Sequence, residues 1–117
     1  MSQLAAEIAA AFDQAIALQR RGQFDAALRL YQQLLQWQPQ NAAAHSNYAN
    51  VLCRLNRHAE AIPSYDRAIA LSPHDAQAYY HRGLALMTLE QHEAAVESFD
   101  KALTLKPDVG FFGWRAQ

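Results

Sequence analysis

The sequence has little of what disulfide frameworks, β-sheets and membrane spans require. Its 117 residues include one cysteine, Cys53, four glycines and four prolines, and valine and threonine are scarce. A single cysteine excludes an intrachain disulfide, and the shortage of β-branched residues argues against a sheet. No apolar stretch approaches the roughly 20 residues that cross a bilayer, and the N-terminus lacks a basic segment ahead of a hydrophobic one. We therefore expect a soluble, cytoplasmic protein.

Neither sign of charge dominates. The chain has 10 basic and 11 acidic side chains and a pI near 6.5. Proteins specialised for nucleic acids, or for membranes through a polybasic patch, usually carry a clear basic excess, so the composition favours neither partner. About a fifth of the residues are alanine, which is the strongest helix former. For a chain of this length, we expect one all-α domain.

A repeat of 34 residues runs through the chain. Pro39, Pro73 and Pro107 stand 34 residues apart. Three further rows keep the same step: Ala27, Ala61 and Ala95; Tyr31, Tyr65 and Phe99; and Ala15, Ala49 and Gly83. Within each unit the apolar residues follow helical spacing, which predicts two helices per unit. We expect helices near residues 3–21, 25–38, 42–55, 59–72, 76–89 and 93–106.

Turn-forming residues punctuate these predicted helices. Gly22 and Asn56 stand where a left-handed residue should end a helix, whereas Glu90 suits that position less and predicts a less regular turn. Pro63 falls near the start of a helix, where its missing N–H and its ring should delay or bend the first turn. Two side chains are placed to cap the following helices: Asn41 and Asp75.

These rows resemble the tetratricopeptide repeat (TPR) family, over residues 8 to 107. The alanine, aromatic and proline positions match closely. The first-helix positions match loosely, at Ala11, Gln14, Ala15 and Leu18, at His45, Tyr48, Ala49 and Leu52, and at Tyr79, Arg82, Gly83 and Leu86. The resemblance implies a right-handed superhelical array of three helix-turn-helix repeats, about 8–41, 42–75 and 76–109. Residues 1–117 would form a single domain, with 110–117 as a partial fourth helix.

In TPR proteins the first helices line a concave face that holds a peptide or a partner helix. On the helical wheel, one stripe of each predicted first helix would lie on that face. Its members are Phe12, Ile16, Gln19, Ser46, Asn50, Cys53, Tyr80, Leu84 and Met87. The alternative is that the apolar members belong to the core of a short array.

Some TPR domains bind the acidic C-terminus of chaperones through a clamp of lysine, asparagine and arginine. Here only Asn50 stands at a fitting place, and the lysines are missing. We therefore expect recognition of an apolar or amphipathic peptide or helix rather than of a terminal carboxylate.

Residues with catalytic or metal-binding chemistry do not converge in the sequence. His58 and His92 are one repeat apart, and equivalent positions on stacked helices lie roughly 10 Å apart, too far to share one metal ion. These two histidines are expected to be half-buried spacers. Cys53 and His81 form the only conceivable nucleophile and base, without an orienting group. We expect no enzyme activity, no metal and no cofactor.

Two classes of function remain open. The chain could be a free-standing adaptor or self-assembling scaffold. It could instead be the TPR module of a larger enzyme, such as a glycosyltransferase or sulfotransferase. Three aromatic residues near the end should be buried, either against residues 93–106 of their own chain or against another molecule in a homo-oligomer: Phe111, Phe112 and Trp114.

Overall fold

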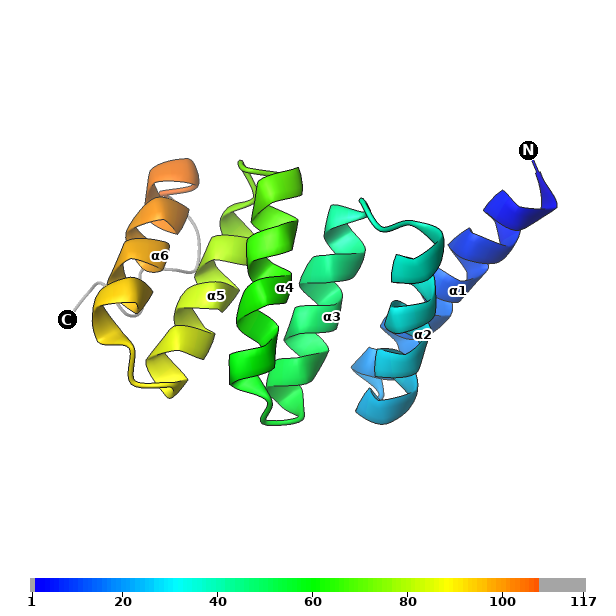
Figure 1. Ribbon diagram of the computed structural model, residues 1–117, viewed down its shortest axis with the longest axis horizontal. Helices are drawn as coiled ribbons and strands as arrows, with labels where there is room; N and C mark the ends of the chain where they lie inside the picture. Colours follow the sequence, from blue (N-terminus) through cyan, green and yellow to red (C-terminus); the bar gives the residue numbers. More distant parts are fainter. Residues whose placement is uncertain (1, 108–117) are drawn as a thin grey trace.

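The computed structural model describes residues 2–107, and this part of the chain consists of helices without any strand. The helices are α1 (Gln3–Arg20), α2 (Phe24–Trp37), α3 (Ala42–Arg54), α4 (His58–Leu71), α5 (Ala76–Thr88) and α6 (His92–Leu105). They stand side by side in a row, in chain order (Figure 1). Helices α1 and α2, α3 and α4, and α5 and α6 pack as pairs, while α2 and α4 each pack against the following pair. The all-α prediction is confirmed; the predicted partial helix at 110–117 lies outside the described residues.

The observed helix boundaries differ from the predicted ones by at most one residue. The second helix of each unit begins at Phe24, His58 or His92, because only one residue separates it from the left-handed residue of the turn. The expectation that Pro63 would delay its helix is wrong, since α4 begins five residues earlier. Because Pro63 lies in the second turn of α4, its missing N–H removes one hydrogen bond of that turn and leaves the first turn intact.

Side-chain caps begin the first helix of every unit. The carboxamide of Asn41 accepts a hydrogen bond from the backbone N–H of Ala44 at 3.0 Å, and the carboxylate of Asp75 accepts one from Ala78 at 3.2 Å. These two caps are as predicted. Ser2 caps α1 in the same way, although the sequence pattern did not single it out.

The turn inside each unit has the same form in all three units. Gly22, Asn56 and Glu90 have φ of 80°, 63° and 62°. The residue after each donates its N–H to a carbonyl five positions back, at 2.8 to 2.9 Å. The prediction of a less regular third turn is therefore wrong. The hydrogen bonds of the turn hold Glu90 in the left-handed region, although a glutamate has no preference for that conformation.

Small residues and aromatic rings alternate through the core. The alanines of the two small-residue rows have no exposed surface, and Tyr31, Tyr65 and Phe99 are at most 2% exposed. At Gly83 the approach is closest, because a Cβ there would lie 2.7 Å from Cε1 of Phe99. Glycine in place of the alanine of the first two units thus makes room for the ring of Phe99.

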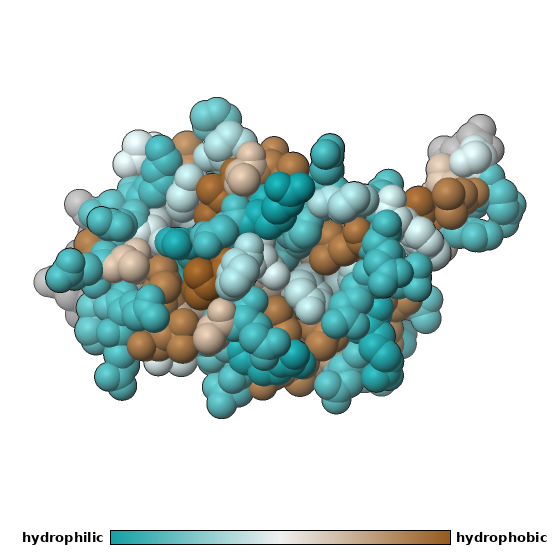
Figure 2. Space-filling model, viewed as in Figure 1, coloured by the Kyte–Doolittle hydropathy of each residue, from teal (hydrophilic) through white to brown (hydrophobic). Residues whose placement is uncertain are grey.

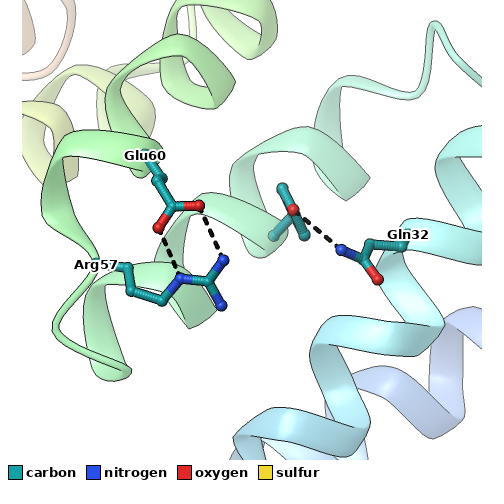
Figure 3. A network of polar contacts seen from close by, with 4 residues as sticks. Gln32, Arg57 and Glu60 are labelled. Atoms are coloured by element: carbon teal, nitrogen blue, oxygen red, sulfur yellow. Dashed lines mark hydrogen bonds and ion pairs between the residues drawn. The ribbon is translucent and has the colours of Figure 1, made fainter.

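Equivalent side-chain pairs connect neighbouring units. The Gln32 amide of α2 donates to the hydroxyl of Tyr48 on α3 at 3.4 Å, and Figure 3 shows Gln32 reaching across the junction. One repeat later, Arg82 donates to Asp66 at 2.7 Å. The same guanidinium also donates to the hydroxyl of Ser98 at 2.7 Å. The second junction therefore contains an ion pair where the first has neutral groups.

Exposed apolar side chains are dispersed over the array. On the face drawn in Figure 2 they appear as patches separated by polar residues. The large ones with substantial exposure are Leu4, Trp37, Leu84, Met87 and Val96. Leu84 and Met87 are neighbours on one helix, which makes the α5 surface the place to look for a binding site.

Candidate functional site

Two adjoining cavities mark the side of the array formed by α1, α3 and α5. The first cavity has a volume of about 320 Å³ and is lined by Gln19, Asn50, Cys53, Arg54, His58, Tyr65, His81, Leu84, Ala85 and Thr88. The second cavity, of about 430 Å³, is lined by Ile16, Gln19, Arg20, Asn47 and Arg54. Gln19 and Arg54 belong to both. We call the two cavities together the groove; it spans all three units.

Buried tyrosine hydroxyls fix two amide side chains of the groove. Tyr31 donates to Oε1 of Gln19 at 2.8 Å, and Tyr65 donates to Oδ1 of Asn50. Because the carbonyl oxygens are engaged from below, the amide NH₂ groups are available as donors to a ligand. Burial raises the pKa of Tyr31 to about 12, while a hydrogen bond with Asn47 lowers it. Burial likewise raises the pKa of Tyr65, so both phenols remain protonated donors.

Cys53 and His81 both line the first cavity, as their conceivable pairing requires. Burial raises the pKa of the Cys53 thiol, and a hydrogen bond with Tyr65, 3.8 Å away, only partly offsets this. Burial also lowers the pKa of the His81 imidazole, an effect that the charge of Asp75 opposes. At neutral pH the pair is thus a thiol and a neutral imidazole. The thiol is the weakly nucleophilic form of cysteine.

A guanidinium is held at the boundary between the two cavities. Arg54 lies over the ring of Phe24, with Cζ 4.8 Å from the ring centroid. A cation over an aromatic face is attracted by the ring quadrupole. The stacking orients the Arg54 head group while leaving its N–H edges accessible, and Arg20 stands one repeat earlier at the rim of the second cavity.

Five of the nine predicted stripe residues line the groove. They are Ile16, Gln19, Asn50, Cys53 and Leu84. Met87 is 44% exposed, and its sulfur lies 3.3 Å from Nδ1 of His92. His92 is itself exposed, which corrects the expectation of a half-buried spacer; His58 is half-buried as expected.

Three of the predicted stripe residues serve mainly in packing. Phe12 meets the ring of Tyr31 edge-on, with centroids 6.2 Å apart, and Tyr80 packs against Phe99 at 5.8 Å. Ser46, at the equivalent position in the second unit, is buried. Phe12 and Tyr80 are half-buried and pack against core rings, whereas Leu84 is 42% exposed.

Two neighbouring rows of residues that were not predicted also line the groove. Asn47 and His81 occupy equivalent positions, and Arg20, Arg54 and Thr88 form another row at the same step. The groove surface is thus shifted from the predicted stripe toward these rows, with part of the stripe still lining it. The 34-residue step that identified the stripe also relates these positions. The repeat therefore indicated which positions are equivalent, but not which row of each helix faces the groove.

The histidines do not assemble into a metal site in the described part of the chain. Within residues 2–107, no group of three or more histidine, cysteine or acidic residues is placed to hold a metal ion. His45 has another role, because its Nε2 lies 2.8 Å from the carbonyl oxygen of Pro39 and ties the connection to α3. The predicted self-association residues Phe111, Phe112 and Trp114 lie outside the described residues.

Comparison with known proteins identifies the array. The tetratricopeptide repeat family profile matches two overlapping segments, residues 12–76 and 49–109. No curated protein matches the sequence. In the described part of the chain, each helix is too short or too polar to traverse a bilayer.

Solved structures share the same architecture. The first TPR of Spaghetti (RPAP3), bound to the HSP90 peptide SRMEEVD, superposes with a TM-score of 0.86 at 25% identity, over 89% of this chain and 82% of that one. The first TPR domain of human RPAP3 gives 0.84 at 25% identity, with the same coverage. MamA from Desulfovibrio magneticus RS-1 gives 0.80 at 30% identity, over 85% of this chain but 56% of that one. The fold is accordingly a helical-repeat superhelix.

Proposed function

The chain belongs to the tetratricopeptide repeat family, and we propose that its groove binds an amphipathic peptide or helix of a protein partner. That a solved relative, the first TPR of RPAP3, is bound to a peptide supports a role as a protein interaction module. The finer proposal concerns which segment the groove accepts, and it depends on the side chains of this chain alone.

The observation that carries the proposal is the contrast between the two ends of the groove. Toward α1 and α3, the amides of Gln19 and Asn50 are held with their donors free, which suits the carbonyl oxygens of an extended backbone. Toward α5, Leu84 lines the first cavity and is 42% exposed, and Met87, outside the cavities on the same helix, is 44% exposed. An apolar ligand side chain would cover surface there that is now in water.

A peptide-display selection on the immobilised protein tests this proposal. Selected peptides should bind the Leu84→Ala variant more weakly by about 1 to 3 kcal/mol, because their apolar anchor loses its contact surface. Val96→Ala is the matched control, since Val96 is 43% exposed but lines neither cavity. Calorimetric titration measures the affinities, and melting curves check the folding of each variant. Equal losses in the Leu84→Ala variant and the control would contradict binding in the groove.

The proposed function is binding without a catalytic step, in the cytoplasm. The raised pKa of Cys53 supports the first part, because it disfavours the thiolate. A Cys53→Ala variant that loses a hydrolytic activity would contradict it. The alternative of an interaction module within a larger enzyme, such as a glycosyltransferase or sulfotransferase, is distinguished by reading the gene beyond the codon for residue 117.

A second proposal is self-association through the C-terminal aromatic residues. Val96 is 43% exposed on α6, whereas Leu28, at the equivalent position of the first unit, is 7% exposed. Ile62, the equivalent in the second unit, packs against the core of the third. An apolar segment could cover the Val96 position in the same way. The candidate residues are Phe111, Phe112 and Trp114.

Deleting residues 110–117 tests self-association. We expect light scattering to show a smaller assembly for the truncated chain, because the burial of the three aromatic rings would be lost. A truncated chain with unchanged mass and melting temperature would contradict the proposal.

A further inference from the structure

The groove contains positive charge that the described protein leaves uncompensated. Arg20 and Arg54 both line the second cavity, and Arg54 also lines the first. No aspartate or glutamate belongs to the described residues that line either cavity. Within residues 2–107, neither arginine takes part in an ion pair, although Arg57 and Arg82 both do.

The Arg54 guanidinium is positioned for a ligand before the ligand arrives. Its stacking on Phe24 restrains a side chain that would otherwise lose rotamer freedom on binding. Gln19 lines both cavities beside it, and its carbonyl oxygen is already engaged by Tyr31. The other polar residues of the second cavity are Asn47 and the two arginines, and the guanidinium groups of the arginines are donors only. A ligand must supply acceptors, and a negative charge would compensate both arginines.

We propose that the partner segment carries an acidic side chain that binds between Arg20 and Arg54, next to an apolar residue that covers Leu84. The inference rests on the proposed peptide-binding function and narrows it to one ligand chemistry. The carboxylate comes from an internal Asp or Glu. The two arginines occur at equivalent positions of neighbouring repeats, so they are distributed along the groove rather than closed around one chain end. The segment is thus acidic toward α1 and apolar toward α5.

The test uses three matched sets of acetylated and amidated peptides of about ten residues, a length that spans roughly 30 Å when extended. The acidic set contains one Glu and two Leu at varied separations in an Ala/Ser background. In the neutral set Gln replaces the Glu, and in the basic set Lys replaces it. Because both ends are blocked, the Glu side chain is the only carboxylate. Fluorescence anisotropy is measured near pH 8, where unperturbed imidazoles are neutral.

The acidic set should bind the wild-type protein about three- to tenfold more tightly than the neutral set, as expected for partly exposed ion pairs. The basic set should bind most weakly. Raising the salt from about 0.05 to 0.3 M should weaken the acidic set and leave the neutral set nearly unchanged.

Charge variants of the protein locate the effect. Arg20→Gln and Arg54→Gln should each reduce the ratio of the affinity for the acidic set to that for the neutral set, while Arg54→Lys should retain part of this preference. Arg67→Gln is the matched control, because Arg67 is an exposed arginine of α4 that lines neither cavity. Melting curves establish that each variant is folded.

The possible outcomes distinguish failure of the acidic-segment inference from failure of the proposed peptide binding. Equal affinities for the acidic and neutral sets, or an Arg67→Gln effect as large as that of Arg54→Gln, would overturn the acidic-segment inference and leave peptide binding standing. The acidic-segment inference would also be overturned, and peptide binding left standing, if neutral peptides matched the affinity of the acidic set only when their C-terminal carboxylate is free. Failure of all three sets to bind would overturn both proposals.

Discussion

Replacing Gly83 with alanine should destabilise the protein, although alanine is the better helix former. A Cβ at position 83 would lie 2.7 and 2.8 Å from Cε1 and Cδ1 of Phe99. Carbon atoms pack best at about 3.5 to 4.0 Å, so the ring would have to move by roughly 1 Å. Phe99 is 2% exposed and packs against Tyr80, with centroids 5.8 Å apart, which leaves the ring little freedom to shift.

Two opposing contributions set the size of the Gly83→Ala effect. Overpacking a core costs about 1 to 3 kcal/mol, whereas alanine in place of glycine inside a helix stabilises by about 0.8 to 1 kcal/mol. The net expectation is a loss of roughly 0 to 2 kcal/mol in the free energy of unfolding. In the second unit, Ala49→Gly at the equivalent position should cost about 1 kcal/mol, because propensity is lost there without any relief of crowding.

Urea denaturation followed by circular dichroism measures both variants. The Phe99→Leu substitution provides the second edge of a double-mutant cycle, since it removes the ring that the new methyl group would meet. Gly83→Ala should then be stabilising in the Phe99→Leu background. The reasoning is refuted if Gly83→Ala alone gains the full 1 kcal/mol or so expected from helix propensity.

Three further predictions follow from the polar contacts of the core. Tyr31→Phe should lower the free energy of unfolding by about 0.5 to 1.5 kcal/mol in urea denaturation, because the hydrogen bond to Gln19 is lost. Burial lowers the pKa of His81 below the value that the imidazole regains on unfolding. Protonation therefore favours the unfolded state, and the stability of the wild type should decline as the pH falls from about 7 through 6.5. The His81→Gln variant should show a smaller change in melting temperature between about pH 7 and 5. Arg82→Met should cost about 1 to 3 kcal/mol in urea denaturation, because it leaves the hydroxyl of Ser98, 2% exposed, without the guanidinium that donates to it.

The arrangement of helices was predictable because the repeat encodes it several times. Independent rows of proline, alanine and aromatic residues agree on one period, and caps such as Asn41 and Asp75 mark where each unit begins. The exception is Glu90, whose left-handed conformation is imposed by hydrogen bonds to the preceding helix rather than by its own preference. Residue type alone therefore gave the wrong prediction for this turn, because the tertiary context determines its backbone conformation.

The composition of the groove was less predictable, because periodicity fixes the spacing along a helix but not its rotation about its axis. The contacts of Phe12 with Tyr31 and of Tyr80 with Phe99 turn that row toward the core. This rotation brings the row of Arg20 to the surface of the groove. The stacking of Arg54 on Phe24 joins two units and has no signature in a single repeat.

The polarity of the groove follows the identity of the core aromatic beneath it. Tyr31 and Tyr65 carry hydroxyls, and the side chains that accept from them, Gln19 and Asn50, are amides. The third unit has Phe99 in the same row, and the stripe positions equivalent to Asn50 and Gln19 are there the apolar Leu84, which lines the groove, and Met87, which lies outside it. A buried hydroxyl needs an acceptor, so a tyrosine favours a polar residue above it and a phenylalanine removes that requirement. The substitution of one core ring between repeats thus accompanies an exposed Leu84 in the third unit where the second unit has Asn50, and this difference gives the groove a direction along which an amphipathic segment can bind.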